Sequence, residues 1–307
     1  MSSTLSSSLL AGVSDELAGA VDRGGAGVVR VDARRRLPAS GILWSADGLV
    51  VTANHVVERD DEIGIGLPDG REAAAKLVGR DPGIDVAVLR IDAADLAPLP
   101  RASQEPRVGH LSLALGRPGP SGVMASFGVI SSVGGPLHLR GGAVLERFVQ
   151  ADVAMLPGFS GGPLIDASGS LIGLNTSTLG RTGGLTVPAF AIDATVATLV
   201  AHGRVRRGYL GVGAQAVRLP QALATSLGQE QGLLIVSVEA DGPADRAGLI
   251  LGDVLLAIDG GAVGQVEQLQ ERLSGDRVGR EVAVKVVRGG EPREIAVTIG
   301  ERQRQGE

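Results

Sequence analysis

The sequence predicts a mainly β protein in which two packed six-stranded β-barrels are followed by a small α+β domain. Two observations carry this prediction. Between Val28 and Ile192, short apolar runs alternate with turn signals, which is the pattern of β-strands. The runs form two sets of six on either side of the proline-containing stretch Leu96–Arg107, and two such sets suit two closed barrels.

Composition limits the classes of function. The chain of 307 residues is long enough for more than one domain, and its 47 glycines suit the tight turns of a β-rich fold. A net charge of −5 offers no overall basic excess, so we expect no nucleic-acid partner. The absence of cysteine excludes disulfides, cysteine catalysis and thiolate metal sites.

Residues 1–26 are expected to form a helical segment. Apolar side chains recur there with helical spacing, at Leu9, Leu10, Val13, Leu17 and Val21. No Lys or Arg precedes this weak apolar stretch, so it does not have the pattern of a secretory signal, and no apolar run is long enough to encode a membrane span. The sequence therefore leaves the location of the protein open: the chain as written is expected to be cytoplasmic, unless a leader has been removed from it.

Residues 27–203 are expected to hold both barrels. The first set of runs is Val28–Asp32, Ser40–Trp44, Leu49–Ala53, Glu62–Leu67, Glu72–Gly79 and Asp85–Ile91. The second set is Leu111–Gly116, Met124–Val133, Val144–Ala151, Pro163–Asp166, Leu171–Thr176 and Leu185–Ile192. A helix over Asp193–Ala201 is expected to follow, with Asp193 as its N-cap and Gly203 as its stop.

Residues 204–303 are expected to form the α+β domain, which begins at the basic hinge Arg204–Arg207. The expected strands are Tyr209–Gln215, Leu233–Val238, Val254–Ile258, Glu281–Val287 and Glu294–Ile299. Two helical stretches, Ala244–Ala247 and Val266–Leu273, lie between these strands in the sequence.

Candidate reactive groups occur in the order His, Asp, Ser. His55 follows a strand and enters a turn, where an imidazole can face a cleft; none of the other three histidines has a comparable setting. Asp85 opens a buried strand, and a buried carboxylate needs a hydrogen-bonding partner such as an imidazole N–H. Asp81 competes with it, but it precedes Pro82 in a turn, where a local capping role is expected.

Ser160 lies among glycines that let the backbone fold tightly around it. Such a loop can direct the N–H groups of Gly158 and Ser160 at one point, as an oxyanion hole requires. A serine hydroxyl becomes a nucleophile when a histidine removes its proton and an aspartate holds that histidine in the correct tautomer. The order His55, Asp85, Ser160 is the order of the triad in chymotrypsin-type enzymes.

The chain resembles the HtrA (DegP/DegS-like) family of serine proteases. The resemblance is carried by Ser40–Ile42, Asp47–Val57, Asp85–Leu89, Gln150–Val153 and Ser160–Leu164, and by Gly208–Val212 at the start of a PDZ-like domain. It implies an ATP-independent endopeptidase that acts on unfolded or damaged polypeptides and cleaves after small aliphatic residues. It also implies a homotrimer or a multiple of it, in which the N-terminal region helps to form the trimer, and members of the family are commonly located in the cell envelope or periplasm.

Three departures from the family pattern stand out. Phe159 replaces the Asn that usually precedes the serine, and its side chain must find an apolar pocket or stay exposed at a cost. If the pocket exists in only one loop conformation, Phe159 becomes a packing switch on the oxyanion hole; the alternative is that Phe159 packs well and the hole is always formed. Pro188 removes a backbone donor near the strand expected to pair with substrate. The loop before Ser40 is short, so a long regulatory loop is missing there.

Phe159 and Pro188 support an alternative function, namely a proteolytically silent peptide-binding scaffold or holdase.

The expected PDZ domain contains a candidate peptide site. Tyr209, Leu210, Gly211 and Val212 would present N–H groups to the carboxylate of a C-terminal peptide, and the strand to Gln215 would pair with that peptide beside the helix Val266–Leu273. The alternative is a PDZ fold that only packs on the protease. No phosphate-binding loop and no His-Glu-x-x-His motif occurs, so we expect no cofactor and no metal.

Overall fold

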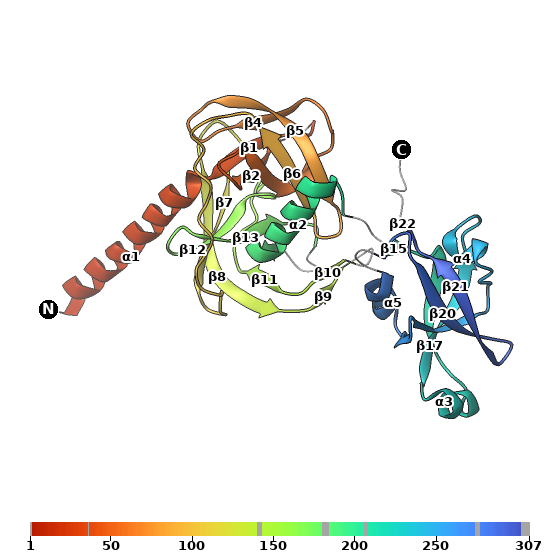
Figure 1. Ribbon diagram of the computed structural model, residues 1–307. Helices are drawn as coiled ribbons and strands as arrows, with labels where there is room; N and C mark the ends of the chain where they lie inside the picture. Colours follow the sequence, from red (N-terminus) through yellow and green to blue (C-terminus); the bar gives the residue numbers. More distant parts are fainter. Residues whose placement is uncertain are drawn as a thin grey trace. The chain divides into compact units, whose positions relative to one another are not determined.

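The computed structural model describes residues 2–35, 37–139, 143–179, 184–205, 208–273 and 277–301. The chain divides into two compact units. The first consists of Met1–Leu139 and Val144–Val205, and the second mainly of Arg206–Glu307 (Figure 1).

The N-terminal helix α1 (Ser2–Gly25) lies within the predicted helical segment 1–26, and its last turns pack against the barrels. Leu17, Ala20 and Val21 join an apolar cluster with residues of the second barrel. Gly24 permits this close approach, because a Cβ there would lie 2.8 Å from the side chain of Ile165. Earlier on the helix, the apolar side chains of Leu9, Leu10 and Val13 are exposed.

The first barrel closes as predicted, in the order β1-β2-β3-β6-β5-β4. Its strands are β1 (Val28–Asp32), β2 (Ala39–Leu43), β3 (Leu49–Ala53), β4 (Ile63–Gly66), β5 (Glu72–Asp81) and β6 (Val86–Ile91). The pairing of Ala53 with Val86 at the ends of β3 and β6 brings the residues on either side of this pair together. That register places the turn after β3 beside the residue that precedes β6.

The second barrel closes in the order β11-β14-β13-β12-β7-β8. Its strands are β7 (Leu111–Gly116), β8 (Met124–Gly134), β11 (Phe148–Ala151), β12 (Pro163–Asp166), β13 (Leu171–Thr176) and β14 (Leu185–Pro188). The single strand expected over Val144–Ala151 is wrong. It is divided between β10 (Val144–Leu145), which pairs with β9 (Leu137–His138) in a separate ribbon, and β11.

The expected boundary after β14 is also wrong. The strand ends at Pro188 rather than Ile192, and helix α2 runs from Ala189 to His202. Pro188 stands at the N-cap with extended dihedrals, and proline is well suited to the start of a helix because it has no N–H to satisfy. Asp193 is therefore inside α2, where it pairs with Arg101 at 3.0 Å. The predicted stop at Gly203 is confirmed, with φ +72°.

The second unit is a six-stranded antiparallel sheet, with the main path β16-β17-β18-β20-β21, and short helices. Its elements are β15 (Gly208–Tyr209), β16 (Val212–Arg218), α3 (Gln221–Leu227), β17 (Gln231–Val238), α4 (Pro243–Arg246), β18 (Val254–Ile258), β19 (Gly261–Ala262), α5 (Val266–Leu273), β20 (Glu281–Arg288), β21 (Glu291–Thr298) and β22 (Gly300–Glu301). Sequence patterning missed α3, a helix of seven residues with no fully buried side chain.

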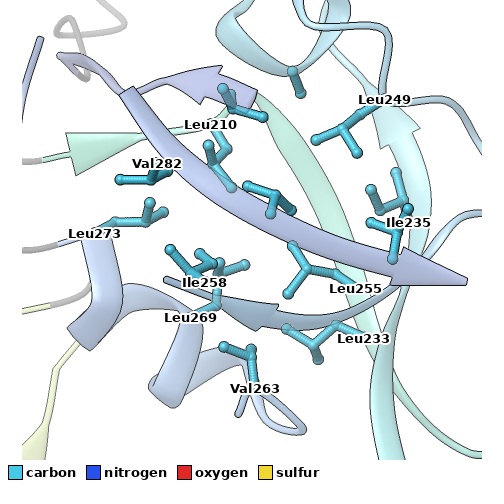
Figure 2. Packing of buried hydrophobic residues seen from close by; sticks show 14 of the residues in the cluster. Leu210, Leu233, Ile235, Leu249, Leu255, Ile258, Val263, Leu269, Leu273 and Val282 are labelled. Atoms are coloured by element: carbon cyan, nitrogen blue, oxygen red, sulfur yellow. The ribbon is translucent and has the colours of Figure 1, made fainter. Parts of the chain in front are cut away.

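One apolar cluster forms the core of this unit. Figure 2 shows Leu210, from the segment before β16, packed with side chains of β17, β18 and α5. Leu269 and Leu273 are the buried residues of α5, so this helix covers the cluster with one face. Because Leu210 is anchored in the core, the backbone around it is held in place directly before the start of β16.

Candidate active site

His55 lies in a short 3-10 turn, Asn54–Val56, that directly follows β3. Two hydrogen bonds tie this turn to Asp85. The Asn54 N–H donates to the Asp85 carbonyl at 3.0 Å, and the His55 N–H donates to Asp85 Oδ1 at 2.8 Å. The backbone that carries the imidazole is therefore fixed by the same residue that contacts its ring.

Asp85 is buried, with 3% of its surface exposed, and it adopts a left-handed conformation at φ +57° just before β6. Its Oδ2 atom lies 2.7 Å from His55 Nδ1. The hydroxyls of Thr176 and Thr178 donate to the same oxygen, the latter at 2.8 Å. Every polar contact of this carboxylate is thus a donor, as an ionised acceptor requires.

Two opposing effects set the pKa of Asp85. Burial raises the pKa of this carboxyl, whereas the hydrogen bond and the positive charge of His55, with the hydroxyl of Thr176, lower it. The net pKa lies below its usual value of 3.8, so the group is a carboxylate at neutral pH. A carboxylate facing Nδ1 holds the proton on that nitrogen and leaves Nε2 of His55 as the basic atom.

Ser160 lies in the loop before β12, and its hydroxyl oxygen is 3.1 Å from Ser177 Oγ. Thr176, which binds Asp85, and Ser177, which contacts Ser160, are adjacent at the end of β13. The end of this strand therefore brings the predicted nucleophile close to the His55–Asp85 pair. The described part of the chain contains no hydrogen bond between Ser160 and His55; such contacts often tighten only when substrate binds.

The predicted oxyanion donors differ from the neighbouring N–H groups of the same loop in having no hydrogen-bond acceptor within the described residues. The N–H groups of Phe159, Gly161 and Gly162 all have backbone acceptors, at 2.9 to 3.0 Å. Those of Gly158 and Ser160 have none among the described residues. Two uncommitted N–H groups that alternate with committed ones are the arrangement that an oxyanion hole needs.

Only glycine fits at position 158. Its φ is +85°, and a Cβ there would lie 2.4 Å from the side chain of Pro118. Gly161 is under the same constraint, with φ +87° and backbone oxygen of Ser40 2.2 Å from a hypothetical Cβ. Two of the glycines around Ser160 are therefore required for two reasons: their φ is positive, and the neighbouring groups leave no room for a Cβ.

Phe159 fills an apolar pocket. Its side chain is completely buried in the core of the second barrel, together with Ile130, Val149 and Leu164. The ring lies against Gly116, where a Cβ would approach it to 2.5 Å. The aromatic side chain points away from the loop surface, and its N–H is bonded to the Leu156 carbonyl at 3.0 Å.

Sequence reasoning missed the groups that contact the candidate triad residues. Thr176 ends the buried strand β13, Ser177 and Thr178 follow it, and nothing local marks them as partners of Asp85 or Ser160. The competitor Asp81 accepts a hydrogen bond from the N–H of Gly83 at 2.8 Å, as expected of a local turn cap. Within the described residues, no group of three or more His, Asp or Glu side chains is placed to hold a metal ion.

The candidate peptide site in the second unit is a short loop between two strands. Tyr209 pairs with Gly300, and Val212 pairs with Val238. The carbonyls of the intervening Leu210 and Gly211 accept hydrogen bonds, whereas no backbone acceptor for their N–H groups is found among the described residues. Since β16 is an edge strand of the sheet, one side of it is open for pairing.

Comparison with known proteins gives this arrangement a family. Residues 39–174 match the trypsin-like peptidase domain and residues 208–299 match the PDZ domain. A solved structure described as the HtrA-type protease AlgW with decapeptide is 32% identical, with a TM-score of 0.76, and the match covers 94% of this chain and 99% of that one. The chain belongs to the HtrA family. The serine endoprotease from Yersinia pestis is similar, with 30% identity, a TM-score of 0.77, and coverage of 92% and 97% of the two chains.

Curated HtrA relatives extend the comparison. A probable periplasmic serine endoprotease, DegP-like, from Halomonas elongata is 41% identical over 87% of this chain, and one from Ectopseudomonas mendocina is 38% identical over 87%. The chain spans 57% of the length of each of these relatives. Because both are named periplasmic, the expected cytoplasmic location has no support. Of the helices among the described residues, none is long and apolar enough to span a bilayer.

Proposed function

We propose that this HtrA protein is a serine endopeptidase that cleaves unfolded or damaged polypeptides, with His55, Asp85 and Ser160 as its triad. The observation that carries the proposal is the 2.7 Å contact of the buried Asp85 with His55 Nδ1, beside a serine loop with two uncommitted N–H groups. The protease domain covers residues 27–203 after the helical segment 1–26, and the PDZ domain covers residues 204–303.

The chemistry follows from these positions. His55 Nε2 removes the proton of Ser160 Oγ as that oxygen attacks the carbonyl carbon of the scissile peptide. The N–H groups of Gly158 and Ser160 bind the oxyanion of the tetrahedral intermediate. Asp85 stabilises the imidazolium, which then protonates the leaving amine. Water then hydrolyses the acyl-enzyme: His55 removes a proton from the water as it attacks the acyl carbon, and returns a proton to Ser160 Oγ as the acid product leaves.

The test is incubation of the purified chain with unfolded casein and, separately, with a peptidyl phosphonate that reacts with activated serines. We expect casein fragments, and a single phosphonate adduct whose labelled peptide contains Ser160. An adduct on another serine would overturn the assignment of the nucleophile. Intact casein and an unlabelled protein would favour the silent scaffold or holdase.

We propose that the PDZ domain binds C-terminal peptides through the Tyr209–Val212 segment. The uncommitted N–H groups of Leu210 and Gly211 and the open edge of β16 support this. Peptides with an apolar C-terminus and a free carboxylate are expected to bind at least about tenfold more tightly than their amides, because charge-assisted hydrogen bonds are lost with the charge. Equal affinities, measured by calorimetry, would refute a carboxylate site.

Two glycines offer a matched control for this site. Gly211 has φ +80° and Gly228 has φ +67°, and neither would bring a Cβ closer than 3.5 Å to another group. Both substitutions to alanine therefore introduce similar backbone strain. We expect Gly211→Ala to weaken peptide binding and Gly228→Ala to leave it unchanged.

We propose a homotrimer assembled in part through α1. Leu9 and Leu10 are 71% and 67% exposed, which is unfavourable for two adjacent leucines in a monomer. Serine at both positions is expected to weaken the trimer, measured by light scattering, while Leu17, Ala20 and Val21 keep α1 docked. The matched control replaces the exposed pair Ile250 and Leu251 by serine, with no expected change. A wild-type monomer at micromolar concentration would contradict the proposal.

We also propose a periplasmic location, on the basis of the printed names of the relatives. Fractionation of the source cells is expected to release the protein with the periplasmic contents. Recovery with the cytoplasm would refute this.

A further inference from the structure

We propose that Ser40 is a positioning residue for the oxyanion hole, a role that deepens the proposed function and rests on it. Ser40 lies on β2 in the first barrel, whereas the serine loop belongs to the second. The residue is completely buried and makes contact with the loop at several points. Among the described residues it makes no hydrogen bond to His55, Asp85 or the Ser160 hydroxyl, and its bonds to the loop go to backbone carbonyls, so we infer that it acts through the backbone that carries the two N–H donors.

The hydroxyl of Ser40 has a defined direction. Its oxygen accepts a hydrogen bond from the Arg117 N–H at 2.8 Å, and it donates to the Gly158 carbonyl at 2.7 Å. The side chain of Arg117 is itself bonded to the carbonyls of Val28 and Gly25, at 2.8 and 3.2 Å. Because an N–H can only donate, the Ser40 proton is directed at Gly158.

The backbone of Ser40 holds the other side of the loop. Its N–H donates to the Ser160 carbonyl at 3.2 Å, and its own carbonyl accepts from the hydroxyl of Thr52 at 2.7 Å. One residue therefore binds the carbonyls of both Gly158 and Ser160. These are the two residues whose N–H groups the proposed oxyanion hole uses.

These contacts help to fix the direction of the Ser160 N–H without touching it. The peptide from Gly158 to Phe159 is held at its carbonyl by Ser40 and at its N–H by the Leu156 carbonyl. The peptide after Ser160 is held at its carbonyl by Ser40 and at its N–H by the Asn175 carbonyl. The peptide between them carries the Ser160 N–H; its own carbonyl accepts from the Gly162 N–H at 2.9 Å, and the two neighbours anchored by Ser40 restrict its rotation further.

Loss of the Ser40 hydroxyl leaves the Gly158 carbonyl without its donor and frees the first of these peptides. A donor that is missing or misdirected lowers turnover by about 10²–10³-fold, and a loosened one by less. The effect falls on the transition state, since the oxyanion exists only there. We therefore expect Ser40→Ala to lower kcat about 10- to 100-fold, with KM changed by less than about threefold.

The chain offers a matched control in Ser112, another completely buried serine on a barrel strand. Its hydroxyl has no hydrogen-bond partner among the described residues. Ser112→Ala thus removes the same atom from a comparable environment without touching the loop. We expect this variant to keep the kcat of the wild type.

The decisive measurement compares wild type, Ser40→Ala and Ser112→Ala for cleavage of a peptide substrate and for inhibition by a peptidyl boronate, which forms a tetrahedral adduct with the serine. For Ser40→Ala, the boronate affinity is expected to fall in proportion to kcat/KM, while affinity for the cleaved product peptide stays constant. A purely structural role would lower the melting temperature and leave the boronate-to-product ratio unchanged, which would overturn the proposal.

A second variant keeps the test open if Ser40→Ala does not fold. Ser40→Cys retains the shape and a weaker donor, so we expect kcat between those of wild type and the alanine variant. A Ser40→Cys enzyme with wild-type kcat and boronate affinity would overturn the proposed role of Ser40 and leave the proposed protease function standing. Absence of cleavage by the wild type would overturn the proposed protease function, and the role of Ser40 with it.

Discussion

Ser160→Ala is expected to reduce cleavage of unfolded casein by about 10⁶-fold, because the triad acts as a unit and little catalysis remains without its nucleophile. The melting temperature is expected to stay nearly constant. The only hydrogen bond of the Ser160 side chain in the described residues is to Ser177, at 3.1 Å in an exposed setting. Initial rates by fluorescence and thermal unfolding of the same preparation check both expectations.

The matched control for this experiment is Ser131→Ala. Ser131 also has an exposed hydroxyl with one hydrogen bond, to the Gln150 carbonyl at 3.1 Å. It lies on β8, away from the triad, and its loss should leave the rate unchanged. If Ser160→Ala cleaves casein at the rate of Ser131→Ala, Ser160 is not the nucleophile.

Asp85→Asn is expected to lower kcat by about 10⁴-fold, because an amide no longer holds the proton on His55 Nδ1. The structure adds a loss of stability. Asp85 Oδ1 accepts from the His55 N–H, and Oδ2 accepts from His55 Nδ1 and two threonine hydroxyls. An amide has only one oxygen, so its NH₂ must face a donor at one of these positions. A buried donor left without an acceptor costs about 1–3 kcal/mol.

The pH dependence of this loss has a definite sign. The pKa of Asp85 in the folded protein lies below its usual value of 3.8. The stabilising effect of the carboxylate is therefore fully present above the unfolded pKa, near 4, and is lost as pH falls through the lower folded pKa. The difference in urea midpoint between wild type and Asp85→Asn is expected to be constant from neutral pH to about pH 5 and to shrink below about pH 4.

Asp81→Asn serves as the comparison, because Asp81 is also buried but accepts from the Gly83 N–H and not from His55. We expect its kcat to remain within a few-fold of wild type, since asparagine keeps an oxygen for that turn. Equal losses of kcat in the two variants would show that Asp85 has no special relation to His55.

The structure removes the physical basis of the silent-scaffold alternative, which depended on Phe159 and Pro188. Phe159 is completely buried in the barrel core, where an aromatic side chain needs no compensating polar contact. Pro188 closes β14 and caps α2, so its missing N–H falls at the end of the strand. Neither residue disturbs the His55–Asp85 pair.

Local sequence pattern was sufficient to predict most strands and to nominate the candidate reactive residues. Runs such as Leu49–Ala53, Leu111–Gly116 and Pro163–Asp166 have the bounds expected from their apolar residues and flanking turns. The spacing of apolar residues is a property of the local sequence, and it indicates which side chains of a strand will be buried. Ser160 was recognisable because its glycines meet a local requirement, namely positive φ.

Where patterning failed, a proline or the shortness of the element was responsible. The helix α2 begins directly after Pro188, whereas the apolar run Ala189 to Ile192 is equally compatible with strand and helix by hydropathy alone. The helix α3 has only seven residues, too few for helical periodicity to stand out from the sequence around it.

By itself, the sequence determined the two barrels and the position of the serine loop, and it supplied the order of the proposed triad. Only the tertiary structure decided what supports them. Thr176 reaches Asp85 across 91 positions of the chain, and Ser40 reaches Gly158 across 118. Such bonds exist because two barrels close and pack with a particular register, and no local preference of Ser or Thr encodes which distant carbonyl or carboxylate it will meet.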